Sequence, residues 1–277
     1  MKSKTAEHPE ISPLFVGIDV GSSRTKAAVL DSALNLVGYD VRKSGTDFAR
    51  TADECLNTSL RMAERDPEDV VYTVSTGYGR KNVVFSKDTR TEIGCHGKGC
   101  YHYFPEAITI IDIGGQDNKI IKLDAASRRL SFKMNRKCAA GTGAFLEEMS
   151  ARLDIPLEDM DGLARKSTDM VKLGSFCTVF SATEVLENIR GGKKIEDIVK
   201  GLFYSVIKRI LEMDSLTEKV VMTGGVVQYN PFLVQMTEVQ IGRSILVPPH
   251  PQLTGAIGAA LYALAAAGPE PLSNRGA

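Results

Sequence analysis

Residues 16–31, VGIDVGSSRTKAAVLD, recur at a constant offset of 93 residues as residues 109–124, TIIDIGGQDNKIIKLD. Each copy holds an apolar run with an aspartate near its end, a turn rich in glycine and polar side chains, and a second apolar run. This pattern predicts a β-hairpin whose turn offers N–H groups and hydroxyls to an anion. Because a repeat at fixed spacing determines an architecture, the two copies predict two similar α/β halves that face each other.

Two facing turns that each carry an aspartate suit phosphoryl transfer. One such turn alone is better explained by an ordinary hairpin, and it lacks the Gly-x4-Gly-Lys-Ser/Thr pattern of a Walker loop. With the repeat counted, we predict that Asp19 and Asp112 hold Mg²⁺, directly or through its waters, and that Gln116 or Asp117 orients the attacking water. The alternative, in which both aspartates merely cap turns, stays open. The predicted phosphate-binding residues are Gly21, Ser22, Ser23, Lys26, Gly114 and Gly115.

Two cysteines, Cys138 and Cys177, each precede a run typical of a helix, residues 144–153 and 182–189. The N–H groups and the dipole at a helix start favour thiolate and other anions. Either cysteine is also explained as a small buried hydrophobe. We predict that the two cysteines bind a metal centre. The turn after Cys138, formed by Gly141, Thr142 and Gly143, is predicted to bind a cofactor.

Three further stretches carry glycines or possible ligands. Residues 220–227 predict a strand that contains Gly224 and Gly225, where glycines permit the close approach of a flat ligand such as adenosine. Residues 75–80, STGYGR, are either a loop near the nucleotide or an ordinary connection. Cys95 and Cys100 have zinc-like spacing, but the second pair of ligands that a zinc site needs is missing.

Composition limits the class of protein. The 277 residues allow two domains, and 34 basic against 34 acidic side chains give no electrostatic case for nucleic acid or an acidic membrane. Residues 1–13 lack the apolar core of a signal peptide, and residues 256–267 are too few to span a membrane. Five cysteines argue against a disulfide framework. We therefore expect a cytoplasmic protein.

Together these motifs resemble a known superfamily. Acetate and sugar kinases, Hsc70 and actin share three signatures, and similar stretches occur here in the same order. Asp19-Val-Gly-Ser-Ser resembles the first phosphate loop, Asp112-Ile-Gly-Gly-Gln-Asp the second, and Met222-Thr-Gly-Gly-Val the adenosine loop. Lys137-Cys138-Ala-Ala-Gly-Thr-Gly and Cys177-Thr-Val-Phe resemble one branch, the BadF/BadG/BcrA/BcrD ATPase family. That branch contains activators of 2-hydroxyacyl-CoA dehydratases and ATP-binding subunits of benzoyl-CoA reductase.

The resemblance implies an α/β fold of the duplicated, actin-like and ribonuclease H-like type, with two facing domains. We expect a polar N-terminal extension over residues 1–13, a first actin-like subdomain over 14–106 and a second over 107–277. The second would carry the cluster cysteines and the adenosine loop. The closing helix over 252–267 is a candidate to pack back on the first.

The resemblance also implies cofactors and partners. In that branch two cysteines of one subunit join two of a neighbour to hold a single [4Fe-4S] cluster, so Cys138 and Cys177 would supply half of the ligands. ATP with Mg²⁺ would gate the transfer of a low-potential electron from ferredoxin to acyl-CoA reductase or dehydratase subunits. The neighbour would be a homologous ATPase subunit or a second copy of this chain. No acyl-CoA site is evident in the sequence.

Within the branch, three stretches look more like the smaller ATP-binding subunit of benzoyl-CoA reductase, an oxidoreductase of anaerobic aromatic degradation. They are Asp117-Asn118-Lys119, Asn135-Arg136-Lys137 and Phe145-Leu146-Glu147-Glu148-Met149. We therefore expect that subunit, with a non-identical homologue across the cluster. The alternatives are a homodimeric activator of a 2-hydroxyacyl-CoA dehydratase, a small-molecule kinase of the same superfamily, and an actin-like filament protein.

Overall fold

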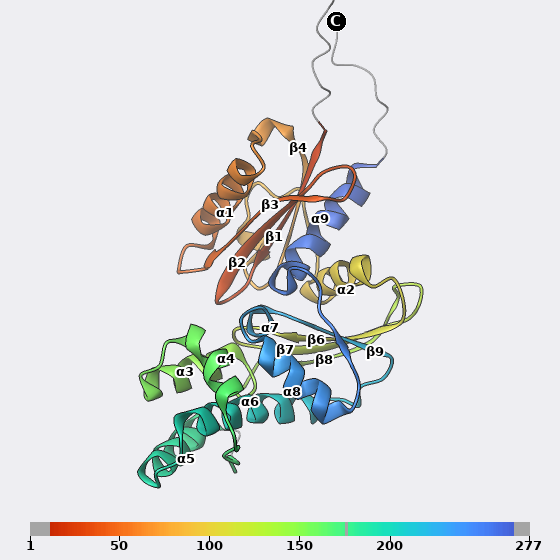
Figure 1. Cartoon of the computed structure of the whole chain (residues 1–277). Helices are drawn as coiled ribbons and strands as arrows, with labels where there is room; N and C mark the ends of the chain where they lie inside the picture. Colours follow the sequence, from red (N-terminus) through yellow and green to blue (C-terminus); the bar gives the residue numbers. More distant parts are fainter. Residues whose placement is uncertain (1–11, 175–176, 269–277) are drawn as a thin grey trace, which may run out of the picture.

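The computed structural model describes residues 12–174 and 177–268, which form two mixed β-sheets with helices around them (Figure 1). Residues 1–11 of the predicted N-terminal extension lie outside the described residues. The first sheet has the strand order β3-β2-β1-β4-β5, in which β1 pairs antiparallel with β2 and parallel with β4. Its strands are β1 (Leu14–Val20), β2 (Arg24–Leu30), β3 (Leu36–Lys43), β4 (Val70–Thr76) and β5 (Asp88–Thr89).

The second sheet repeats this topology with the order β10-β9-β6-β7-β8, in which β6 pairs antiparallel with β7 and parallel with β9. The register of the two hairpins is also repeated, since Asp19 lies opposite Lys26 and Asp112 lies opposite Lys119. The predicted duplicated α/β fold is thereby confirmed. The strands are β6 (Ile108–Ile113), β7 (Asn118–Leu123), β8 (Arg129–Asn135), β9 (Lys219–Thr223) and β10 (Ile245–Leu246).

Helices cover both faces of the first sheet. Successive side chains of a strand point to opposite faces, so residues 16, 18 and 20 of β1 pack with α1 (Phe48–Met62). Neighbouring side chains of the sheet pack on α9 (Thr254–Ala267) instead. The side chain of Asp47 caps α1 by accepting a hydrogen bond from the N–H of Arg50 at 3.0 Å.

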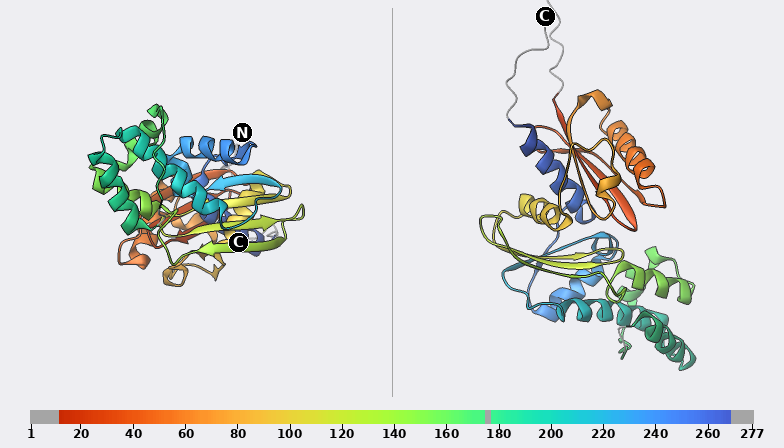
Figure 2. Two further views of the ribbon diagram at one scale, coloured as in Figure 1. Left: turned by 90° about the horizontal axis from the view of Figure 1, so that it is seen from below. Right: turned by 180° about the vertical axis from the view of Figure 1, so that it is seen from behind.

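The helix α2 (Glu92–Tyr103), which the sequence did not predict, lies between the two sheets, and it is yellow in Figures 1 and 2. It packs on α9, which comes from the far end of the described chain and also contacts β1, β2 and β4. Glycines make this approach possible: a Cβ at Gly99 would overlap the carbonyl oxygen of Thr254, and one at Gly258 that of Cys95. The domain boundaries given above stay a prediction.

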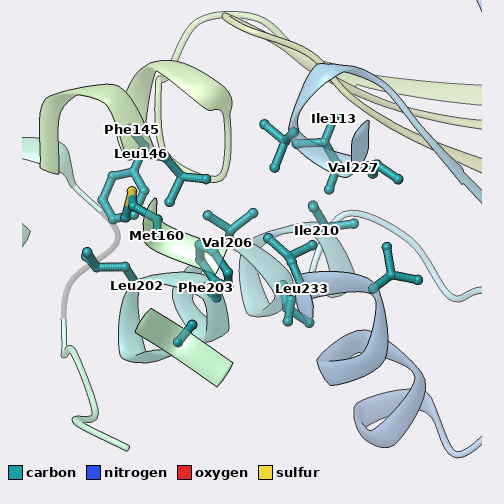
Figure 3. Close-up of a cluster of buried hydrophobic side chains, with 14 of the residues drawn as sticks. Ile113, Phe145, Leu146, Met160, Leu202, Phe203, Val206, Ile210, Val227 and Leu233 are labelled. Atoms are coloured by element: carbon teal, nitrogen blue, oxygen red, sulfur yellow. The ribbon is translucent and has the colours of Figure 1, made fainter. Parts of the chain in front are cut away.

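The core of the second half is centred on the amphipathic helix α6 (Ile195–Leu211), whose apolar side chains meet Phe145, Leu146 and Met160 from neighbouring helices (Figure 3). The predicted strand over 220–227 ends at Thr223 because Gly224 has a φ of 104° and a helix follows. The remaining helices are α3 (Gly143–Leu153), α4 (Met160–Lys166), α5 (Thr178–Arg190), α7 (Gly225–Tyr229) and α8 (Pro231–Ile241), with short 3₁₀ helices at Pro67–Asp69, Arg80–Asn82, Leu157–Asp159 and Pro251–Leu253.

Over residues 12–174 and 177–268, no helix is both long and apolar enough to cross a membrane.

Candidate active site

A cavity of about 1020 Å³ lies between the two halves of the molecule, and turns from both sheets line it. The first hairpin turn contributes residues 21–24 and the second contributes residues 114–117. The turns nearly touch, since a Cβ at Gly115 would stand 2.8 Å from the Cβ of Ser23. The predicted site residues on the cavity wall are Gly21, Ser22, Ser23, Lys26, Asp112, Gly114, Gly115, Gln116, Asp117, Gly143, Gly224 and Gly225.

The hydrogen bonds of the two turns are also repeated. The N–H of Gly21 donates to the carbonyl of Arg24 at 3.1 Å, and the N–H of Gly114 donates to the carbonyl of Asp117 at 2.9 Å. Each aspartate at the preceding strand end then binds the lysine that lies opposite it. Since topology, register and turn geometry all recur, the offset of 93 residues in the sequence corresponds to a spatial duplication of the site.

Six acidic and lysine side chains form a network at the cavity, and all of them except Asp19 line it. Lys26 Nζ donates to Asp19 Oδ2 at 2.9 Å. Lys119 Nζ lies 3.1 Å from Asp112 Oδ2, 2.6 Å from Asp117 Oδ1 and 2.9 Å from Glu92 Oε1. Four carboxylates thus face two ammonium groups, so negative charge stays in excess even when His96, beside Asp112, carries a proton.

That charge balance fits a divalent cation. Asp19 and Asp112 are each 1% exposed, and the second oxygen of each, Oδ1, has no hydrogen-bond partner among the described residues. A buried carboxylate oxygen without a partner is costly. Hydrated Mg²⁺ would bind such oxygens through its waters, because it prefers oxygen ligands and keeps several waters. The two aspartates therefore suit the predicted Mg²⁺ site.

The network also sets the protonation states. Burial lowers the pKa of the Lys26 ammonium, but Asp19, together with the charges of Asp112 and Glu92, outweighs burial and the net pKa is raised. Burial opposes the charge of Lys119 too, yet its three carboxylate partners raise its pKa well above the ordinary value. Burial raises the pKa of Asp112, and the positive charges of His96 and Lys119 more than reverse this, so the net pKa is lowered.

Two residues of this network, Glu92 and His96, were not predicted from the sequence. Both stand on α2, where one helical turn separates them, and both line the cavity. His96 Nε2 lies 3.7 Å from Asp112 Oδ2, and its Nδ1 lies 3.0 Å from Thr254 Oγ1. The sequence signal was slight, since His96 follows Cys95 in a segment that suggested only a metal site.

The loop over residues 75–80, for which two roles were open, reaches the cavity. Gly77, Tyr78 and Arg80 all line it. Gly77 has a φ of 87°, and a Cβ there would stand 2.5 Å from Asp19 Oδ1. Only glycine permits this close passage beside the aspartate.

The predicted adenosine turn, Gly224 and Gly225, also lines the cavity. Gly224 adopts a φ of 104°, a Cβ there would stand 2.9 Å from Asp112 Oδ1, and a Cβ at Gly225 would meet Gln252 Nε2 at 3.2 Å. Apolar and carboxylate side chains line the cavity as well, a mixture that suits a base and a ribose. They are Leu146, Glu147, Leu157, Glu158, Val226 and Tyr229.

The loop that carries Cys138 is hydrogen-bonded to the second turn. The N–H groups of Gly143 and Ala144 donate to the carbonyls of Gly114 and Gly115 at 2.9 and 2.7 Å. Asn118 Nδ2 donates to the carbonyl of Gly141 at 2.6 Å. Gly141 and Thr142 are buried beside this contact and do not line the cavity, unlike Gly143. A displacement of the second turn would therefore pull on the cysteine loop.

Cys138 and Cys177 are both exposed, and neither lines the cavity. Cys177 is the N-cap residue of α5. Over residues 12–174 and 177–268, no group of three or more histidine, cysteine, aspartate or glutamate side chains could hold a metal ion. A cluster on these two cysteines therefore requires ligands from outside the described part of this chain.

The other three cysteines are buried and suit a structural role. Burial raises the pKa of the Cys95 thiol to about 12 and also raises the pKa values of Cys55 and Cys100. A thiol must lose its proton to bind a metal. These three positions therefore disfavour metal binding.

Comparisons with known proteins point to one family. The profile of the BadF/BadG/BcrA/BcrD ATPase family matches residues 16–263. The activator of lactoyl-CoA dehydratase from Anaerotignum propionicum is 42% identical over 255 residues, which cover 91% of this chain and 98% of that protein. The solved structure of the activator of the 2-hydroxyisocaproyl-CoA dehydratase from Clostridium difficile, with bound ADPNP, matches with a TM-score of 0.87 at 37% identity, over 94% of this chain and 100% of that one.

These similarities overturn the prediction of a benzoyl-CoA reductase subunit. A benzoyl-CoA reductase polypeptide from Thauera aromatica is 28% identical over 261 residues, covering 90% of this chain and 92% of that polypeptide. The dehydratase activator above is far more similar. The three stretches that suggested the reductase lie in the second turn, the cysteine loop and α3. Those segments form one hydrogen-bonded unit beside the cavity. A few side chains shared within this unit therefore do not identify the partner enzyme.

Proposed function

This chain belongs to the BadF/BadG/BcrA/BcrD ATPase family, and from that premise we propose that it is an ATP-hydrolysing activator of a 2-hydroxyacyl-CoA dehydratase. The observation that carries the proposal is the hydrogen-bonded link between the second turn of the cavity and the loop of Cys138. A nucleotide site and a cysteine pair are thereby joined in one molecule. A small-molecule kinase would leave this link and the two exposed cysteines without a role.

ATP would lie with its base beside Gly224 and Gly225 and its phosphates between the two turns. Asp19 and Asp112 would hold Mg²⁺ through its waters, which would neutralise charge on the transferred phosphoryl group. Asp117 already accepts a hydrogen bond from Lys119, whereas Gln116 is exposed in the cavity. Gln116 is therefore better placed to orient the attacking water, and Asp117 to hold Lys119.

Cys138 and Cys177 would bind half of a [4Fe-4S] cluster, with the other half supplied by a second copy of the chain. Such a cluster would pass a low-potential electron, received from a ferredoxin-like donor, to the dehydratase. The surface beside Cys177 supports a partner, because several large apolar side chains of α5 are exposed and α5 lies at the outer end of the second half (Figure 2). They are Val179, Phe180, Leu186 and Ile189.

The coupling would work through the second turn. Hydrolysis removes the terminal phosphate from between the turns, and the two halves can then change their separation, as in other nucleotide switches. The carbonyls of Gly114 and Gly115 hold the start of α3, so this movement reaches the loop of Cys138 directly.

The test is anaerobic purification followed by iron and sulfide analysis and EPR of the reduced protein. Wild type should contain one cubane cluster per two chains, and Cys138→Ala and Cys177→Ala should each abolish it. Cys55→Ala, at a buried thiol, is the matched control and should keep the cluster.

A second assay addresses the dehydratase. Reduced wild type with ATP should activate a 2-hydroxyacyl-CoA dehydratase, whereas the two cysteine variants should not. Iron-free wild type, or protein that phosphorylates a metabolite instead, would reject the proposal.

A further inference from the structure

Arg136 stands where the cysteine loop meets the nucleotide cavity. In the second sheet Asn118 of β7 pairs with Asn135 of β8. The next residue outward on each strand is Asp117 on one side and Arg136 on the other, so Arg136 emerges beside the second turn. Its side chain lines the cavity together with Met134.

Arg136 differs from the two lysines of the network because its positive charge is unpaired among the described residues. Lys26 and Lys119 are both paired with carboxylates at 2.6 to 3.1 Å. No hydrogen bond or ion pair joins Arg136 to any other residue that the structure describes. The arginines Arg24 and Arg80 also line the cavity, but they belong to the first half. The triphosphate chain carries several negative charges, and a cation already paired compensates them less than an unpaired one.

Resting on the proposed function, we propose that Arg136 binds the terminal phosphate of the nucleoside triphosphate, and that through it the second half distinguishes triphosphate from diphosphate. The guanidinium group presents two parallel N–H donors that match phosphate oxygens. Its position beside the second turn directs this contact to the phosphate end of the cavity. Because Cys138 lies only two residues further along, the terminal phosphate becomes part of the environment of the cysteine loop.

The test compares the binding of ADPNP and ADP, each with Mg²⁺, by isothermal titration calorimetry. Arg136→Ala should weaken ADPNP about tenfold, the loss of one charge-assisted contact, and change ADP less than about twofold. Arg136→Lys, which keeps the charge but loses the paired donors, should lie between wild type and Arg136→Ala. Lys137→Ala removes the neighbouring positive charge outside the cavity wall and should change neither affinity.

The outcomes separate this inference from the proposed function. Equal weakening of both nucleotides in Arg136→Ala, or no weakening of ADPNP, would overturn the role of Arg136 while leaving the nucleotide site intact. Wild-type protein that binds neither nucleotide would overturn the proposed function and this inference together. Because Arg136 is exposed, Arg136→Ala should unfold at the wild-type temperature, which circular dichroism checks.

Discussion

At the scale of single residues, Lys119 holds the site together. It is 1% exposed and forms ion pairs with carboxylates from three segments. We expect Lys119→Met to lower the free energy of unfolding by about 3–5 kcal/mol, because it leaves buried negative charge without its partner. Urea unfolding followed by circular dichroism measures this. The control, Lys133→Met, alters a lysine whose side chain is 55% exposed and should cost less than about 1 kcal/mol.

The loss of unfolding free energy in Lys119→Met should depend on pH, and the pKa shifts give the direction. The pKa of Asp112 is lowered by folding, so its stabilising contribution is present above its unfolded pKa of about 3.9 and is lost as pH falls through the lower folded pKa. The pKa of Lys119 is raised, so its contribution persists up to its unfolded pKa of about 10.4 and is lost above it.

The difference in unfolding free energy between wild type and Lys119→Met should therefore be largest between about pH 5 and pH 9 and shrink toward pH 3. Urea titrations at several pH values measure it. A difference that stays constant down to pH 3 would show that Lys119 stabilises the protein by packing and not by charge.

The residue scale also shows the limit of prediction from sequence. Asp19 and Asp112 could be singled out because each follows an apolar run and the run is repeated. Glu92 and His96 belong to no repeat, and only the folding of α2 between the sheets brings them beside Asp112. A contact made by segments without a shared pattern leaves no local signal.

At the scale of elements, the crossing of α2 and α9 depends on glycine. A Cβ at Gly258 would overlap the backbone of Cys95, which cannot rotate away. We expect Gly258→Ala to destabilise the protein by about 1–3 kcal/mol through overpacking. Gly162→Ala, on α4 with open space around it, should instead stabilise by about 0.4–1 kcal/mol. Thermal unfolding distinguishes them, and equal effects would contradict the argument.

The same scale explains which elements could be predicted. The hairpins β1-β2 and β6-β7 follow from the repeat, and α6 follows from its apolar periodicity. The strand β8 was missed because its residues are exposed along most of their length, so no face is marked as apolar. The helix α2 was missed because it contains three glycines, and its packing on α9 outweighs their poor helix propensity.

At the scale of the whole molecule, nucleotide binding should stabilise both halves together, because both line one cavity. ADPNP with Mg²⁺ at about one hundred times its dissociation constant should raise the free energy of unfolding by about 2.7 kcal/mol. Asp112→Asn should abolish the part of this gain that depends on Mg²⁺, as would removal of the metal with EDTA. Stabilisation that is the same with and without Mg²⁺ would argue against the role of the aspartates.

The whole molecule also shows why the partner enzyme could not be predicted from short motifs. The two hairpin turns, the turn at Gly224 and the cysteine loop make up only a small part of the chain. Similarity over 255 residues, and not the three short stretches, separates the dehydratase activators from the reductase. The features that would recognise an acyl-CoA enzyme are spread over a surface, and a surface has no sequence signature.

The return of α9 to the first sheet has a consequence for biosynthesis. Ala28, Leu30 and Phe15 are covered by side chains of α9, which the ribosome makes more than two hundred residues later. The strands that are synthesised first therefore keep one apolar face bare until nearly the whole described chain has emerged. The nascent first half is completed only when this helix is made, so a chaperone that shields β1 and β2 during translation would protect their bare face until then.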